Sequence, residues 1–80
     1  MVVALALIRV QKGSVADVAK SLGAISEVTE VYSVAGAYDL VAKIQVEEYE
    51  RMAEVITGKL QQIDGIASTE TLMAFHTYKF

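Results

Sequence analysis

Residues 2–10, VVALALIRV, are apolar at almost every position, and no other stretch limits the possible folds of this chain as strongly. With the period of two that a strand imposes, apolar side chains fall on both faces: Val3, Leu5 and Leu7 on one, and Ala4, Ala6, Ile8 and Val10 on the other. Such a strand is typical of a sheet interior that is covered on both sides. The sequence therefore predicts a central strand whose two faces both need a cover.

Two helices are predicted from apolar residues that recur at helical spacing. The first follows the turn QKGS, where Ser14 and Asp17 form a candidate capping box, and it ends at Gly23. The second covers residues 47–63 and has glutamates in its first turn, where the helix dipole favours acidic side chains. Both helices are amphipathic, so each has one apolar stripe to bury.

Three further strands are predicted from alternation and from β-branched residues. They cover residues 27–35, 40–46 and 66–76. Gly36 lies between the first two of these strands, which are close enough in the sequence to pair as a hairpin.

The element order is strand, helix, strand, strand, helix, strand, and we expect residues 1–80 to form a single domain. With right-handed crossovers, this order predicts an α+β, ferredoxin-like βαββαβ fold, in which two helices cover one face of a four-stranded antiparallel sheet. The helices leave the other face of strand 2–10 uncovered. The same face of a second copy is the simplest cover, which predicts dimerisation through the sheet, as a dimeric α+β barrel.

The composition leaves association as the means of stabilising so short a chain. A domain of this size buries only about 60–65% of the surface that its unfolded chain exposes. The sequence has no cysteine and one histidine, so it offers neither a disulfide nor a structural metal site, and no cofactor is expected. We therefore expect a homo-oligomer.

Charge and hydropathy exclude two classes of partner. The net charge of −3 comes from acids and bases mixed along the chain, without a cluster of Lys and Arg to neutralise phosphates, so direct nucleic-acid binding is not expected. No segment approaches the run of about 20 apolar residues that spans a membrane. Residues 1–10 also lack the basic start and the cleavage site of a signal peptide. We expect a cytoplasmic protein without a membrane partner.

The turn GAYD, residues 36–39, carries more chemistry than a hairpin needs. Gly36 lets another group approach the backbone, whose exposed N–H groups can hold a carboxylate. Asp39 adds an anionic acceptor, and Tyr38 adds apolar area with a hydroxyl at its tip. Donors and an acceptor in one loop suit a zwitterion such as a free amino acid. The alternative is a hairpin in which glycine and aspartate serve backbone geometry alone, and the residues by themselves leave both interpretations open.

Two stretches, VYSVAGAYDLVAKIQV and LQQIDGIASTETLMAFHTYK, contain further short motifs in a fixed order. They are a Gly-x-Tyr-Asp turn at Gly36, Tyr38 and Asp39, a Gly-Ile pair at Gly65 and Ile66, a threonine at Thr69 or Thr71, and a lysine at Lys79. In these motifs the sequence resembles the ligand-binding RAM domain (regulation of amino acid metabolism) of the Lrp/AsnC transcriptional regulators. The resemblance covers essentially the full chain.

The resemblance implies a RAM-like domain that dimerises through its sheet, often assembles into rings of dimers, and binds an amino-acid effector between subunits. Strand hydroxyls are ordinary by propensity, but beside a ligand they would add donors. Carried over by position, the implied ligand-binding residues are Gly36, Ala37, Tyr38 and Asp39 of the turn and Ser68, Thr69 and Thr71 of the last strand. The resemblance implies that Asp39 faces the ammonium group of the ligand.

Full-length members of this family place a helix-turn-helix DNA-binding domain ahead of the RAM domain, and this chain begins with the first RAM strand. We therefore expect a non-enzymatic amino-acid sensor that affects transcription of amino acid metabolism genes indirectly, through mixed oligomers with a full-length Lrp/AsnC regulator. One alternative is a small dimeric α+β-barrel enzyme, such as a monooxygenase or isomerase, with His76 or Tyr49 as the catalytic candidate. The other alternative is a purely structural oligomerisation module.

Overall fold

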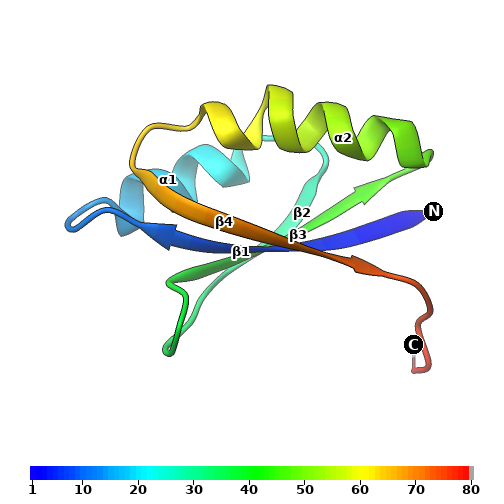
Figure 1. The fold of residues 1–80 in the computed structure, drawn as a ribbon, viewed down its shortest axis with the longest axis horizontal. Helices are drawn as coiled ribbons and strands as arrows, with labels where there is room; N and C mark the ends of the chain where they lie inside the picture. The colour runs from blue at the N-terminus through cyan, green and yellow to red at the C-terminus, as the bar shows by residue number, and fades with distance from the viewer. Residues whose placement is uncertain (80) are drawn as a thin grey trace.

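Four strands and two α-helices follow one another in the predicted order (Figure 1). In the computed structural model, which describes residues 1–79, the elements are β1 (Val2–Val10), α1 (Val15–Gly23), β2 (Val28–Ser33), β3 (Leu40–Val46), α2 (Tyr49–Gly58), a short 3₁₀ helix η1 (Leu60–Gln62) and β4 (Ile66–Ala74). The strands predicted for residues 2–10 and 40–46 have the observed bounds. None of the helices among the described residues combines the length and the apolar character that a membrane crossing requires.

The sheet is antiparallel and has the strand order β2-β3-β1-β4. Each helix joins two parallel strands and leaves room for one antiparallel strand between them, so β1 and β3 become the central strands. Both helices lie on the same face of the sheet (Figure 1). The predicted ferredoxin-like fold is therefore confirmed.

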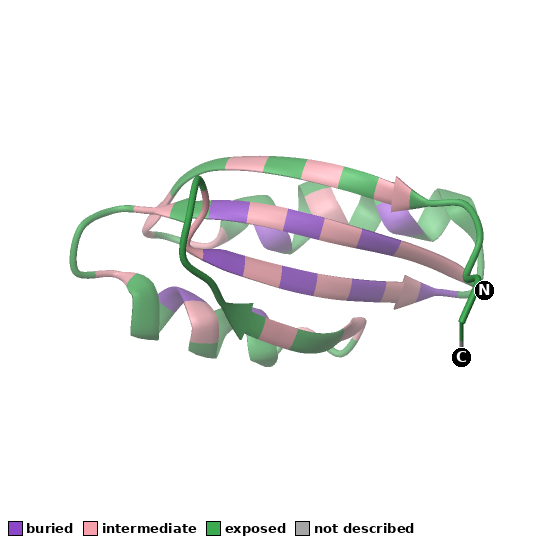
Figure 2. Ribbon diagram, turned by 90° about the horizontal axis from the view of Figure 1, so that it is seen from below, coloured by how far each residue is buried: buried purple, intermediate pink, exposed green. Residues whose placement is uncertain are grey.

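The hydrophobic core lies between the helices and one face of the sheet. Burial alternates along β1 and β3, as the period of two requires (Figure 2). The buried side chains come from both layers: Ala4, Ala6, Ile8, Leu40, Ala42, Ile44 and Val46 from the sheet, and Val18, Leu22, Met52, Val55 and Leu60 from the helical layer. Because three of the central strand residues are alanines, the large side chains of the helices can pack directly over the sheet.

The other side of the sheet is called the open face below, because neither helix covers it (Figure 2). Its members are the alternate residues of the four strands: Val3, Leu5, Leu7, Arg9, Glu30, Tyr32, Val41, Lys43, Gln45, Ser68, Glu70, Leu72 and Ala74. The centre of the open face is apolar, and Lys43 forms an ion pair with Glu30 beside it at 3.9 Å. The prediction that the helices cover only one face of the first strand is confirmed.

α1 begins directly after Ser14, as predicted, but the capping of its start differs from the prediction. Ser14 precedes the helix, but its side chain makes no capping hydrogen bond, so the predicted capping box with Asp17 is wrong. The side chain of Ser14 instead lies beside Gly65, where the chain enters β4. The position of the Ser14 side chain thus reflects a contact with a segment that is distant in the sequence.

Three other elements end earlier in the chain than predicted. The helix predicted for residues 47–63 ends at Gly58, because Lys59, with φ of −121° and ψ of −58°, leaves helical geometry before η1 begins. The strands predicted for residues 27–35 and 66–76 end at Ser33 and Ala74. The last pairs of these strands are Ser33 with Leu40 and Ala74 with Val3.

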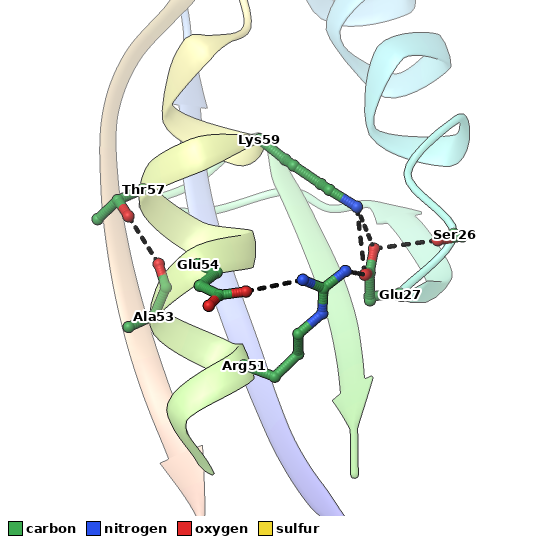
Figure 3. A network of polar contacts seen from close by, with 7 residues as sticks. All are labelled: Ser26, Glu27, Arg51, Ala53, Glu54, Thr57 and Lys59. Atoms are coloured by element: carbon green, nitrogen blue, oxygen red, sulfur yellow. Dashed lines mark hydrogen bonds and ion pairs between the residues drawn. The ribbon is translucent and has the colours of Figure 1, made fainter. Parts of the chain in front are cut away.

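A cluster of charged side chains joins the start of β2 to α2 (Figure 3). Arg51 Nη2 donates to Glu27 Oε2 at 2.6 Å, and Lys59 Nζ donates to Glu27 Oε1 at 3.0 Å. Hydrogen bonds from Lys59, from a backbone N–H and from Arg51 lower the pKa of Glu27 from 4.5 to about 2. The cluster holds α2 against the edge strand of the sheet.

Candidate functional site

In the connection between β2 and β3, residues 34–37 are exposed, and Tyr38 and Asp39 are half-buried. Gly36 has a φ of +136°, a conformation that L side chains rarely adopt. A Cβ atom added at Gly36 would meet no heavy atom within 4 Å. Glycine is therefore required here by the backbone conformation, and not by a close neighbour in the same chain. Ala37, which follows it, is also exposed. Space for another molecule therefore remains on this side of the turn.

Asp39 is bound to the backbone of both neighbouring strand ends. Its N–H donates to Ile8 O at 2.9 Å, and its own carbonyl accepts the N–H of Val34 at 3.0 Å. Its carboxylate Oδ2 accepts the N–H of Val10 at 2.9 Å, which extends the pairing of β1 beyond Ile8. These contacts support the backbone-geometry interpretation of Asp39, and its carboxylate uses Oδ2 for this purpose.

Tyr38 lies over the hairpin end of the open face. Its hydroxyl donates to Glu70 Oε1 of β4, and this hydrogen bond is the main cause that raises the pKa of Tyr38. On the other side, the guanidinium carbon of Arg9 is 5.4 Å from the centroid of the Tyr38 ring, within the range of a cation–π interaction. Tyr38 therefore stands between a cation and an anion.

Arg9 and Glu70 are residues that the sequence analysis did not single out. Alternation along residues 2–10 already places Arg9 on the same face as Leu7 and Leu5, and alternation along the last strand places Glu70 with Ser68. The missing information was the strand order, because only the pairing of β1 with β4 puts Arg9 opposite Ser68 and next to Glu70.

The three predicted hydroxyl residues of β4 do not gather on one side. Ser68 pairs with Arg9 and faces the open side, near Tyr38. Thr69 pairs with Ile8 and Thr71 with Ala6, so both point toward the helices. Thr71 lines a cavity of about 240 Å³ below α2, together with Tyr49, Met52, Ala53, Ile56 and Met73. The structure therefore places Ser68 on the open face beside Arg9 and leaves Thr69 and Thr71 on the opposite side of β4.

The turn and the start of β4 are linked through the end of β1. Val10 donates to Asp39 Oδ2, and the next N–H along the chain, that of Gln11, donates to Gly65 O at 2.7 Å. Gly65 has a φ of +95°, and a Cβ atom there would lie 3.0 Å from Val18 Cγ2. The two motifs that are far apart in the sequence thus lie at the same end of the sheet.

The residues proposed for an enzyme lie elsewhere. His76 belongs to the exposed segment after β4 and is 6.2 Å from the Tyr78 ring, centroid to centroid. Tyr49 begins α2 and lines the cavity below that helix, which His76 does not reach. Within residues 1–79, no group of three or more histidine or acidic side chains is placed to hold a metal ion. The structure does not combine His76 and Tyr49 into one site.

Comparison with known proteins adds the family context. A family model described as Lrp/AsnC ligand binding domain matches residues 3–80. The chain is 34% identical over 73 residues to the HTH-type transcriptional regulator FL11 of Pyrococcus abyssi, a match that covers 91% of this chain and 48% of that protein. It is 38% identical over 52 residues to the regulatory protein AsnC of Escherichia coli, with 65% of this chain and 34% of that protein covered. The matched part of this chain spans about half the length of FL11 and about a third of the length of AsnC.

Several solved structures have the same fold as this chain. TTHA0845 from Thermus thermophilus is 36% identical with a TM-score of 0.93, and the match covers 100% of both chains. The structure of E. coli AsnC is 28% identical with a TM-score of 0.93, over 99% of this chain and 54% of that one. A Neisseria meningitidis regulator, NMB0573, solved as a complex with L-Met, is 14% identical with a TM-score of 0.88 over 99% of this chain and 53% of that one, a likeness that shows the fold alone.

Proposed function

The chain belongs to the Lrp/AsnC ligand binding domain family, and from this premise we propose that it binds a free amino acid at an interface between two of its own copies. The bound amino acid then shifts the equilibrium between assembly states. The observation that carries the proposal is the family match over residues 3–80, because it assigns the ligand-binding fold to nearly the whole chain.

The side chains around the turn support a zwitterionic ligand. Arg9 offers a guanidinium for a carboxylate, and Glu70 together with Asp39 Oδ1 offers acceptors for an ammonium group. The exposed backbone beside Gly36 adds N–H donors. The candidate site therefore consists of residues 36–39, Ser68, Arg9 and Glu70, and it leaves out Thr69 and Thr71, which lie on the helical side of β4.

The open face supports an interface between copies. Its centre is apolar and lacks the cover that the helices give to the other side. It also carries side chains of both charge signs, so two identical faces can meet without a net repulsion between like charges. The candidate site lies at the hairpin end of this face, where a second copy would close it.

The same fold is known with an amino acid bound in the Neisseria meningitidis regulator, which is why a free amino acid is the class of ligand that we propose. A ligand that binds between copies couples to assembly directly, because it binds only the assembled state. The curated relatives are named transcriptional regulators. We therefore propose that this domain affects transcription by forming mixed assemblies with a full-length regulator of the family.

Thermal unfolding measured in the presence of each of the twenty amino acids tests the proposal. A ligand at about a hundred times its Kd stabilises the folded protein by about 2.7 kcal/mol, which raises Tm selectively for the effector. Sedimentation of the same samples should show a change in assembly for that amino acid and no change for the others. A panel without any selective rise in Tm would remove the basis for the ligand assignment.

A further inference from the structure

Two groups of apolar side chains on the described chain have no cover. The first is in the segment after β4, residues 75–79, where Phe75 is 90% exposed and Tyr78 is 92% exposed. The second is at the hairpin end of β2, where Tyr32 is 48% exposed and Val34 is 38% exposed. Large apolar side chains at this exposure mark a contact surface when they gather in one place.

The segment 75–79 extends beyond the strand that β4 pairs with. Pairing with β1 ends at Val3 opposite Ala74, and β1 itself begins at Val2. The only ring contact of the segment among the described residues is the edge-on one between His76 and Tyr78. Phe75 and Tyr78 therefore have no packing partner in their own sheet.

The two groups lie at opposite ends of the sheet, and both project to the side of the open face. Figure 1 shows the hairpin turn and the C-terminal segment below the sheet, with both helices above it, and Figure 2 places the two at opposite ends of the strands. Within one copy, the length of the sheet separates them. A two-fold rotation can stack the open faces of two copies against each other so that opposite ends of the two sheets lie together. This rotation brings each C-terminal segment to the hairpin end of the other copy.

We propose that residues 75–79 of each copy clasp the hairpin end of β2 in a second copy, with Phe75 and Tyr78 packed on Tyr32 and Val34. The inference rests on the proposed pairing through the open face, and it adds the segments that hold that pairing. The contact occurs twice and is reciprocal, as a closed two-fold interface requires. The partner is therefore a second copy of this chain.

Cross-linking tests the contact directly, because the natural sequence has no cysteine. The variant Val34→Cys/Tyr78→Cys, treated with a short bis-maleimide, should give a covalent dimer on a denaturing gel. The matched control is Val15→Cys/Tyr78→Cys, because Val15 is 39% exposed and lies on α1, away from the open face. The control should remain a monomer on the gel.

Sedimentation equilibrium measures the contribution of the clasp. Phe75→Ser/Tyr78→Ser should raise the Kd of the dimer by about tenfold or more. Tyr32→Ser/Val34→Ser should raise the Kd by a similar factor. The four changes together should raise the Kd by less than the product of the two separate factors, because both pairs of changes remove the same contact. Tyr49→Ser, an exposed aromatic on α2, should leave the Kd within about twofold.

The outcomes separate the two proposals. A wild-type chain that stays monomeric at all concentrations overturns both the pairing and the clasp. A wild-type dimer whose Kd is unchanged by the Ser variants, with no cross-link between positions 34 and 78, overturns the clasp and leaves the pairing through the open face intact. A cross-link that forms within one chain also overturns the clasp.

Discussion

At the scale of single residues, Asp39 is bound through its N–H, its carbonyl and its carboxylate. Aspartate is common in turns because its side chain can replace a backbone acceptor. Here Oδ2 does so for Val10, which is why the sequence alone could not distinguish a backbone role from a ligand role. The structure allows both roles, since the two carboxylate oxygens can serve different partners.

Replacing Asp39 by alanine leaves the N–H of Val10 without its acceptor, and we expect a loss of about 1–2 kcal/mol in the free energy of unfolding. Asp39→Asn keeps a side-chain oxygen and should lose less than half as much. Urea denaturation of the two variants beside the wild type measures both effects. Equal losses in the two variants would contradict the acceptor role.

Ser68 and Thr71 offer a test of the two sides of β4. Ser68→Ala changes the side that carries Arg9 and Tyr38, and we expect it to weaken the stabilisation by the effector amino acid several-fold. Thr71→Val changes the side below α2 and should leave the response to the amino acid unchanged. Tm shifts at several ligand concentrations give the comparison. A larger loss in Thr71→Val would place the ligand on the helical side.

At the scale of elements, residue patterns predicted β1 and β3 to the residue, β1 from its nearly continuous apolar run and β3 from its alternation of apolar and polar residues. They placed α1 after Ser14 and ended it at Gly23, as observed, but they predicted the wrong cap for its start and ended α2 too late. Ser14 lies against Gly65, and the chain leaves helical geometry at Lys59, whose side chain binds Glu27 at the start of β2. Such ends depend on contacts with segments that are distant in the sequence, which no local pattern contains.

The Glu27 cluster predicts how stability depends on acid. The pKa of Glu27 is lowered from 4.5 to about 2 in the folded protein, so its contribution is present above pH 4.5 and is lost as the pH falls from 4.5 toward 2. Unfolding followed by urea titration across this range should show a decline in stability that is smaller in Glu27→Gln. Glu54→Gln, at an exposed partner of Arg51, is the control and should keep the decline of the wild type. A decline of the same size in Glu27→Gln would show that other carboxyl groups cause it.

At the scale of the whole molecule, the open face predicts a dimer that a single charge disrupts. Leu7 lies in its central strand, opposite Val41, and Leu7→Lys places an ammonium group in the apolar centre of the proposed interface. We expect the dimer to dissociate at micromolar concentration while the circular dichroism of the fold is retained. Ala16→Lys on the exposed side of α1 serves as the control. A Leu7→Lys variant that remains dimeric would show that the copies associate through another surface.

The candidate site was predictable in part. The turn residues and the start of the last strand were found from motifs, and the structure does bring these two segments to one end of the sheet. The division between Ser68 on one side and Thr69 and Thr71 on the other follows from alternation once the strand is placed. Arg9 and Glu70 could not be assigned, because their position beside Tyr38 depends on which strands are neighbours.

The sequence by itself determined the order of elements, the central place of residues 2–10 and the need to cover their second face, because periodicity and hydrophobicity are properties of local stretches. Only the tertiary structure decided what surrounds Tyr38, how Asp39 uses its carboxylate, and that the exposed ends of β2 and β4 lie at opposite ends of one face. These features arise from pairing between strands far apart in the chain. Pairing of that kind is an outcome of the whole fold and is not encoded in any single segment.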